Sequence, residues 1–244
     1  LGDAATSYRL YTSIDGRAFD DGLEVTNPEV TLTGMGGIYE PVYFRVSSVN
    51  DGGESFPTAV VGAIPSPDDT AIAVVDGFDR LDRGLLLMRD AGSIGVVTHM
   101  QLERMNRYDY AVEHLEALTA AGVPADGFDA DVIADGLAAL TGYDLVIWFV
   151  GQESTEDETF SAAEQAALRD FVDGGGHLMV SGAEIGWDLD SYGDAADQAF
   201  YAEVLGATLA EDDAATFDVE PATTGIFAGM DPMGFDDGSG HAYE

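Results

Sequence analysis

The sequence contains no cysteine and no lysine, and each absence removes a class of function. Without cysteine there is no disulfide, no thiolate nucleophile and no zinc–thiolate site. Arginines account for all nine Lys and Arg positions, against 46 aspartates and glutamates, which gives a formal net charge of −37. Nucleic acids and anionic membrane surfaces are bound by clustered basic residues, so this charge argues against both as partners. No apolar run approaches the ~20 residues that a membrane helix needs, so we expect no membrane insertion.

The acidic residues have two interpretations. A hydrophobic content of 46% is typical of a globular protein rather than of a disordered acidic tail. The acids could form a binding surface for cations or basic partners, or they could be a whole-surface adaptation to salt, of the halophilic type. Because they are spread along the whole chain, the sequence favours salt adaptation.

The two ends of the sequence indicate a fragment. The chain opens at Leu1 without a methionine, and it stops at Glu244 without a helix end or a turn signal. We therefore expect a longer parent polypeptide with further domains, whose signal peptide would not be visible here.

Residues 1–65 alternate between apolar and polar side chains with period two. Turn signals divide this region into short strands, which we expect at 8–12, 23–25, 30–32, 43–50 and 59–63. Short strands at this spacing predict a β-sandwich. The later part also resembles the F strand, the following loop and the G strand of a fibronectin type III domain, through residues 44–46, Asn50, 53–55 and Pro57. The resemblance implies a sandwich that is truncated at its N-terminus.

From residue 66 onward the pattern changes to alternating strands and helices. A stiff polar hinge at 64–69 marks the boundary, so we expect one domain at 1–65 and a second at 66–244. Strands are predicted at 71–75, 144–150 and 177–181, and helices at 106–121, at about 132–140, after a capping box of Ser161 and Glu164, and at about 195–205. Short connections between these elements predict a three-layer α/β domain with a mainly parallel sheet.

Each of the three predicted parallel strands ends at an acidic residue. Asp76, Glu153 and Glu184 should therefore share the carboxyl edge of the sheet, where ligands bind in such folds. They could form a general acid/base pair or an oxygen-ligand cation site. Alternatively, each carboxylate caps a helix or accepts hydrogen bonds from loop amides.

The segment from Gly182 to Gly186 predicts a tight turn between strand and helix, with Glu184 exposed at its apex. Here the second domain resembles the class I glutamine amidotransferase-like fold, a flavodoxin-like α/β fold whose turn carries a cysteine. Glutamate stands at that position here, and the sequence has no cysteine, so the thiol chemistry and the glutamine hydrolysis of that family are excluded.

A closer resemblance is to large secreted bacterial proteins that place such a domain after fibronectin type III modules, often labelled xanthan lyase or N-acetylmuramoyl-alanine amidase. The matching stretches span nearly all of the second domain and comprise residues 75–80, 106–114, 151–155, 181–188, 225–229 and 235–239. The resemblance implies an extracellular or cell-surface location.

Ligand contacts at the same edge are predicted for Gly182, Gly186, Trp187 and Ser154. Trp187 could stack on a sugar ring or pack under the loop, and Ser154 also belongs to a capping-box pattern. His114 has the position of a packing histidine or of a base. The four histidines show no zinc-site spacing, so no metal and no cofactor is predicted.

These observations favour a non-catalytic binding or scaffolding module of a secreted bacterial protein that handles cell-wall or exopolysaccharide material. The first alternative is a hydrolase or lyase acting on such glycans, with Glu184 and either Glu153 or Asp76 as its acid/base pair. The second is a small-ligand sensing domain. A catalytic pair should lie about 5–10 Å apart around an open cleft. In a scaffold, backbone amides would bind Glu184, and Trp187 would close the cleft.

Overall fold

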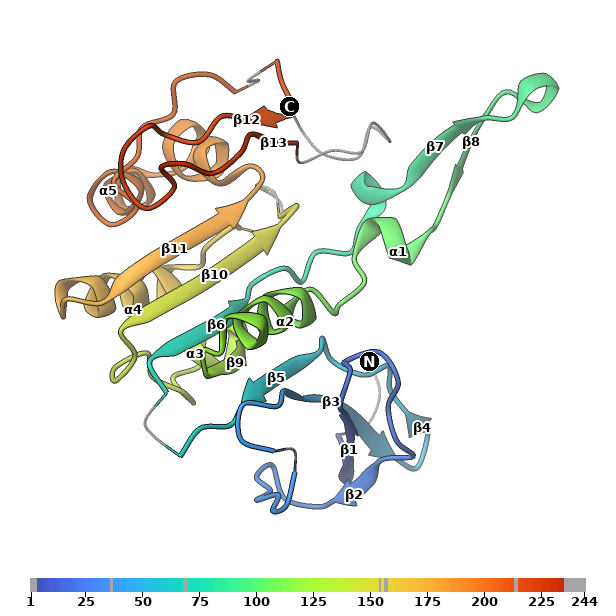
Figure 1. The fold of residues 1–244 in the computed structure, drawn as a ribbon. Coiled ribbons are helices and arrows are strands. Elements are labelled where there is room, and N and C mark those ends of the chain that lie inside the picture. Colours follow the sequence, from blue (N-terminus) through green and yellow to red (C-terminus); the bar gives the residue numbers. More distant parts are fainter. Residues whose placement is uncertain are drawn as a thin grey trace.

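The computed structural model describes residues 4–35, 37–67, 70–153, 155, 158–212 and 215–234. Within these ranges the chain forms an α/β fold on one mixed sheet of nine strands, with two small two-stranded sheets beside it (Figure 1). The strand order is β11-β10-β6-β9-β5-β3-β1-β2, and β4 pairs with β3. The strands of the large sheet are β1 Ser7–Ser13, β2 Leu23–Val25, β3 Val42–Asn50, β4 Gly53–Glu54, β5 Val61–Ile64, β6 Ile72–Asp76, β9 Ala125–Asp129, β10 Leu145–Gly151 and β11 His177–Gly182.

Four neighbouring strands, β9, β6, β10 and β11, are parallel. The first of them in the chain, β6, lies between β9 and β10, so the strand order reverses there, as in doubly wound sheets. Ala73, Val74 and Val75 in β6 are at most 1% exposed, because helices cover both of its faces. This burial accounts for the continuous apolar run in the sequence. The predicted α/β architecture with parallel strands is confirmed.

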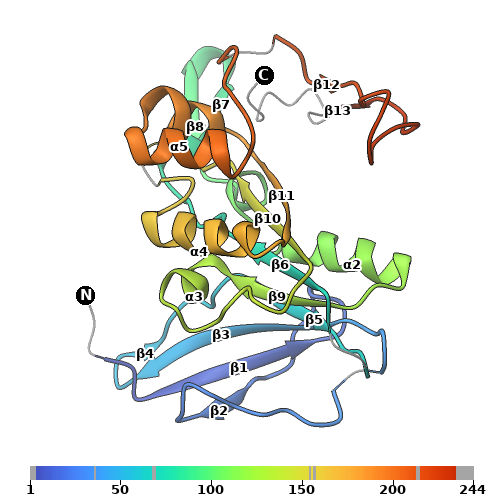
Figure 2. The same ribbon diagram turned by 90° about the vertical axis from the view of Figure 1, so that its left-hand side faces the viewer.

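Helices lie on both faces of the parallel strands (Figure 2). On one face, α2 (Ala111–Ala121) packs Val112 and Leu115 against a core that includes Phe149 of β10. On the other face, Trp148 of the same strand lies in a core formed with α3 (Ala130–Ala134), α4 (Ala162–Asp173) and α5 (Ala195–Glu203). Alternate side chains of β10 therefore serve two separate cores.

The helix boundaries follow local capping chemistry. α4 begins at the predicted capping box, in which Ser161 and Glu164 exchange side-chain and backbone hydrogen bonds. α2 begins at Ala111, five residues later than predicted, because Asn106 is fully buried in the preceding loop. The Asn106 amide donates to the carbonyl oxygen of Phe78 (2.8 Å), and its side-chain oxygen accepts from the N–H of Tyr108 (2.8 Å). These bonds hold residues 106–108 in a non-helical conformation. The predicted helix at 132–140 is the shorter α3, and α5 ends two residues before its predicted end.

The strands of residues 7–64 belong to the same large sheet. The predicted sandwich is not confirmed, since these strands form a single layer in the described residues, and 30–32 are not a strand. β5 pairs antiparallel with β9 through Ala63↔Asp126 and Ile64↔Ala125. Gly127 allows this approach, because a Cβ there would lie 2.4 Å from the carbonyl oxygen of Gly62. The sheet thus continues past residue 65, and the division into two domains stays a prediction.

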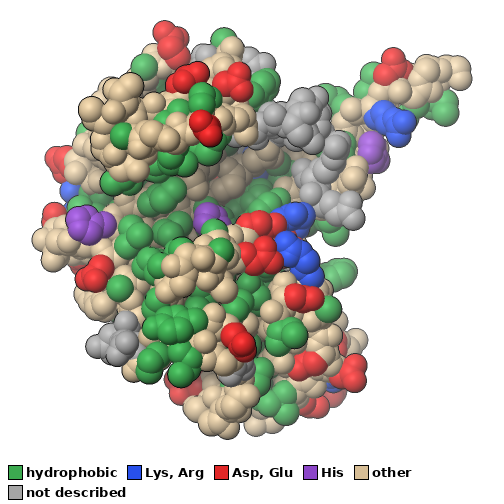
Figure 3. Space-filling model, in the orientation of Figure 1, with side chains coloured by type: hydrophobic (Ala, Val, Ile, Leu, Met, Phe, Trp, Pro, Cys, Tyr) green, Lys and Arg blue, Asp and Glu red, His purple; other side chains and the backbone are tan. Residues whose placement is uncertain are grey.

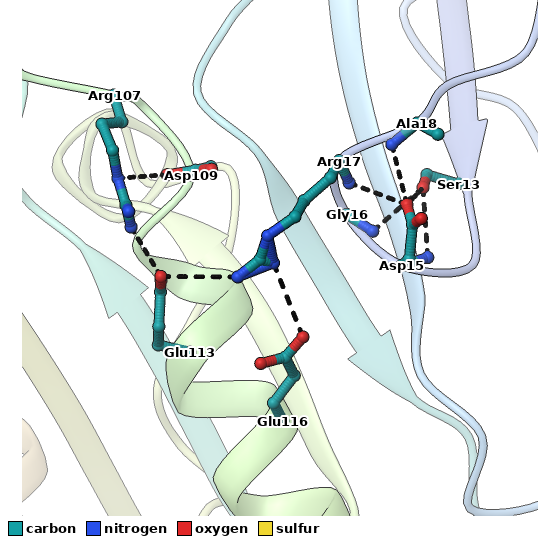
Figure 4. Close-up of polar contacts among 9 residues, drawn as sticks. All are labelled: Ser13, Asp15, Gly16, Arg17, Ala18, Arg107, Asp109, Glu113 and Glu116. Atoms are coloured by element: carbon teal, nitrogen blue, oxygen red, sulfur yellow. Dashed lines mark hydrogen bonds and ion pairs between the residues drawn. The ribbon is translucent and has the colours of Figure 1, made fainter. Parts of the chain in front are cut away.

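Two of the nine arginines form ion pairs with acidic residues of α2 (Figure 4). One lies in the turn after β1, and the other lies in the loop that precedes α2. The turn after β1 is fixed by Asp15, which accepts from the N–H groups of Arg17 (2.9 Å) and Ala18 (2.8 Å). From this turn the Arg17 guanidinium lies 3.6 Å from both Glu113 and Glu116 on α2. Arg107 donates to the same Glu113 carboxylate (2.6 Å). The ion pairs partly offset the repulsion between acids on one helix face.

The connection from β6 to α2 includes an arm that the sequence did not predict. After a short 3₁₀ helix (Arg83–Leu85), strands β7 (Leu87–Asp90) and β8 (Val96–His99) form a hairpin that projects from the body (Figure 1). A second 3₁₀ helix (Gly92–Ile94) lies at its tip, and α1 (Leu102–Met105) leads back to the body. Near the C-terminal end, β12 (Asp218–Val219) pairs with β13 (Met233–Gly234). None of the helices in the described ranges has the length and apolarity required to span a membrane.

Candidate functional site

The parallel strands place their carboxyl ends at one edge of the sheet, where the strand order reverses between β6 and β10. In doubly wound sheets a crevice forms at this edge, because successive crossover connections leave on opposite faces. Here the connection from β6 to β9 includes α2 on one face, and the connection from β9 to β10 includes α3 on the other. A cleft of about 950 Å³ lies beside this crevice, at the ends of β10 and β11.

Besides the ends of β10 and β11, the lining includes residues from several other parts of the chain. Tyr110 and His114 come from the α2 side, the loop after β11 contributes Glu184 and Trp187, and Asp212 comes from the segment after α5. Figure 3 shows this side of the molecule, where the surface is hollowed between α2 and the C-terminal part of the fold. Aromatic and aliphatic side chains form most of the lining, with few polar groups, which is typical of small-molecule sites.

The turn after β11 has the geometry that the glycine spacing indicated. Glu184 has a φ of 63°, in the left-handed region that few non-glycine residues adopt. The flanking glycines allow close packing, because a Cβ on Gly182 would lie 2.3 Å from the Val150 side chain and a Cβ on Gly186 would lie 2.9 Å from the Tyr201 hydroxyl. The N–H of Ala183 also donates to the carbonyl oxygen of Gly151 (2.7 Å). These contacts hold the turn firmly against the sheet, with Glu184 in the lining of the cleft.

The turn leads into a short π-helix, Trp187–Tyr192. Asp188 in this helix is 8% exposed, and its carboxylate accepts from the N–H (2.9 Å) and hydroxyl (2.8 Å) of Thr159. Trp187 therefore belongs to a segment that the hydrogen bonds between Asp188 and Thr159 hold against the rest of the fold. Its side chain lines the cleft and is 38% exposed, so it narrows the cleft without closing it.

The Glu184 carboxylate is half-buried and has no hydrogen bond or ion pair with any residue that the structure describes. Burial is the main cause that raises its pKa, and the negative charge of Asp212 raises it further. The positive charge of Arg80 acts in the opposite direction. Glu184 is thus available to a ligand, and it takes up a proton more readily than an exposed glutamate.

Glu153, the second predicted acid, is only 1% exposed and is not part of the cleft lining. One carboxylate oxygen accepts the backbone N–H of Arg80 (2.7 Å). The Arg80 guanidinium is itself buried, donates to the carbonyl oxygen of Gln152 (2.9 Å) and lies 3.3 Å from the Asp82 carboxylate. Glu153 therefore organises the loops after β6 and β10, and the structure does not bring it into the cleft with Glu184.

Asp76, the third predicted acid, is 5% exposed and also lies outside the cleft lining. Its Oδ1 accepts from the N–H of Phe78 (3.0 Å), and its Oδ2 has no hydrogen-bond partner in the described part of the chain. Burial is the main cause that raises its pKa to about 7, and the charges of Asp129 and Asp79 add to the effect. Because Phe78 lines the cleft, the hydrogen bond from its N–H to Asp76 helps to position the cleft wall in the loop after β6.

Of the residues predicted to contact a ligand, some line the cleft and one is not described by the structure. Gly182, Gly186 and Trp187 line the cleft, whereas Ser154 lies outside the described residues. His114 packs on Phe149, with ring centroids 4.5 Å apart, and also lines the cleft, and burial lowers its pKa. Asp212 was missed, because it follows Glu184 by almost thirty residues in a segment without a motif.

The acidic side chains in the described lining of the cleft are Glu184 and Asp212, whose carboxylates accept hydrogen bonds. Among the residues that the structure describes, no group of three His, Asp or Glu side chains is placed to hold a metal ion. The stretch 235–239, which the secreted-protein resemblance included, lies beyond the described residues.

Comparisons with protein-family models, with curated proteins and with solved structures found no match.

Proposed function

We propose that this protein is a non-catalytic binding module whose site is the cleft at the ends of β10 and β11. The observation that carries this proposal is the pairing of a half-exposed Trp187 with a Glu184 carboxylate that no described residue binds, in one open cleft. Aromatic side chains offer an apolar face to a sugar ring, and carboxylates accept hydrogen bonds from its hydroxyls. The ligand class that fits is a glycan.

The biological setting is proposed from the two resemblances in the sequence. A fibronectin type III-like segment followed by an amidotransferase-like domain is an arrangement of secreted bacterial proteins that handle cell-wall or exopolysaccharide material. On this proposal the module is extracellular or attached to the cell surface, as one part of a longer parent chain with further domains.

A second candidate, a glycan hydrolase or lyase, is favoured by one observation. Glu184 and Asp212 line the same cleft, and the charge of Asp212 contributes to the raised pKa of Glu184. A carboxyl group with a raised pKa beside a second carboxyl group is an arrangement that general acid/base catalysis can use. The pair differs from the predicted one, because Glu153 and Asp76 are not in the lining.

One experiment separates the two candidates. Wild-type protein and the Glu184→Gln variant are incubated in salt with peptidoglycan fragments and with polysaccharides. Binding is followed through tryptophan fluorescence, to which Trp187 of the cleft contributes, and cleavage products are sought by mass spectrometry. Saturable binding without products supports the binding module. Products from wild type that disappear in the variant would replace it with the enzyme, and neither binding nor products from folded protein would contradict both.

A further inference from the structure

The charged groups of the cleft are all of one sign. Glu184 and Asp212 are the acidic side chains in its described lining, and that lining includes neither arginine nor lysine. Burial lowers the pKa of His114, which favours the uncharged form of this side chain. A ligand that enters the cleft therefore meets carboxylates and uncharged groups.

Among the described residues, Arg80 is the buried cation near the cleft, and it does not alter this conclusion. Arg80 is close enough to lower the pKa of Glu184, but its side chain is 7% exposed and is not part of the lining. Its guanidinium donates to the Gln152 carbonyl oxygen and pairs with Asp82. An anionic group of a ligand would have to displace these partners, and it would also approach Glu184 and Asp212.

We infer that the cleft prefers ligands that carry a protonated amine on a ring-shaped body, such as amino-sugar units, over neutral or acidic sugars. This inference rests on the proposed binding function and specifies its ligand class. The ammonium group would lie between the Glu184 and Asp212 carboxylates, and the ring would contact Trp187. Aromatic faces also attract cations, so the same tryptophan favours the protonated amine.

The fixed position of Glu184 strengthens the preference for ligands that carry a protonated amine. The turn that carries it is held by the close contacts of Gly182 and Gly186, so little backbone ordering is needed when a ligand binds. Acidic sugars would bring a like charge into a cleft that has no cation in its described lining, which suppresses their binding. N-acetylated sugars would keep the ring contact and lose the charge interaction.

The test compares three oligosaccharides of equal length: glucosamine, N-acetylglucosamine and galacturonate hexamers. Affinities are measured calorimetrically at about pH 6, where the amine is protonated. The salt concentration is 1 M, where the Debye length is about 3 Å and the field of the whole protein is screened. We expect the glucosamine hexamer to bind about tenfold more tightly than its N-acetylated form, and the galacturonate hexamer to bind most weakly.

Three variants with the same change in net charge locate the effect. Glu184→Gln removes a cleft carboxylate and should abolish most of the preference. Asp170→Asn removes an exposed acid of α4, on the opposite side of the sheet, and should leave the preference unchanged. Asp212→Asn is a second variant in the cleft. Because Asp212 is exposed, this variant can replace Glu184→Gln in the test if Glu184→Gln fails to fold.

The outcomes distinguish this inference from the proposed function. Equal affinity for the amine and N-acetyl hexamers would overturn the inference and leave the binding module intact, as would a preference that survives both cleft substitutions. The absence of binding by all three hexamers would remove the proposed glycan-binding function and the inference with it.

Discussion

The backbone N–H of Arg80 donates a 2.7 Å hydrogen bond to a carboxylate oxygen of Glu153, which joins the loop after β6 to the loop after β10. The two residues are 73 positions apart, and both are buried. The bond holds together the two strand ends between which the order of the sheet reverses. It makes Glu153 a structural acid, although its position at a strand end resembles that of a catalytic one.

Glu153→Ala should therefore destabilise the fold. The substitution removes the buried acceptor for the Arg80 N–H, so the free energy of unfolding should fall by about 1–3 kcal/mol. Glu153→Gln keeps an acceptor and should cost less. Urea unfolding measures both, with Glu184→Gln as the control expected to change stability by less than about 0.5 kcal/mol. A similar loss in the Glu153→Ala and Glu184→Gln variants would contradict this assignment.

Asp76 should make stability depend on pH in the opposite sense to most carboxylates. Burial raises its pKa in the folded state to about 7, whereas an exposed aspartate has a pKa of about 3.9. Between these values the folded protein binds more protons than the unfolded chain, so this group's contribution to stability falls as pH rises and levels off above about pH 7.

The Asp76→Asn substitution removes this titration and keeps an acceptor for the Phe78 N–H. The variant should match the wild type at about pH 4 and exceed it at about pH 8 by a few kcal/mol. Urea unfolding of both proteins at the two pH values gives the difference directly. A difference that is the same at both pH values would show that Asp76 does not titrate in this range.

Salt should stabilise this protein. With a net charge of −37 the folded state repels itself, and the repulsion decreases as the Debye length shortens from about 10 Å at 0.1 M salt to about 3 Å at 1 M. The melting temperature should rise over this range. Calorimetry in sodium chloride measures it, and a melting temperature indifferent to salt would contradict the salt-adapted interpretation of the surface.

Elements with local signals were predictable from the sequence. The apolar run of β10, the capping box of Ser161 and Glu164 and the glycine pair around Glu184 each specify their structure within about seven residues, and each is present close to its predicted position. The arm of β7 and β8 gave no such signal, because Met88, Ile94 and Val96 are exposed, and burial does not impose an alternating pattern on it.

Contacts between distant residues were not predictable from periodicity. The pairing of Ile64 with Ala125 places β5 beside β9, and no local pattern indicates that partner. Likewise, the orientation of an acid at a strand end depends on the loop that packs over it. Arg80 covers Glu153, whereas nothing in the described chain binds the Glu184 carboxylate. The sequence places three acids at one edge, and tertiary packing brings only one of them into the cleft.

Tyr43 provides a test of whether the N-terminal strands and the parallel strands unfold together. Its side chain is fully buried in the core beneath α2, beside Val112 and Leu115. Tyr43→Ala should lower the free energy of unfolding by about 3–5 kcal/mol, because it leaves a cavity in that core. Both tryptophans, Trp148 and Trp187, lie in the second predicted domain, so their fluorescence reports whether damage to β3 reaches the parallel strands.

Tyr43→Phe is the matched control. The Tyr43 hydroxyl is buried and has no hydrogen-bond partner in the described chain, so its removal should cost less than about 1 kcal/mol or stabilise the fold. We expect one unfolding transition in urea, displaced to lower concentration by Tyr43→Ala and nearly unmoved by Tyr43→Phe. If the tryptophan transition of Tyr43→Ala instead coincides with that of wild type, residues 66–244 unfold independently of β3, and the continuous sheet contains two separate domains.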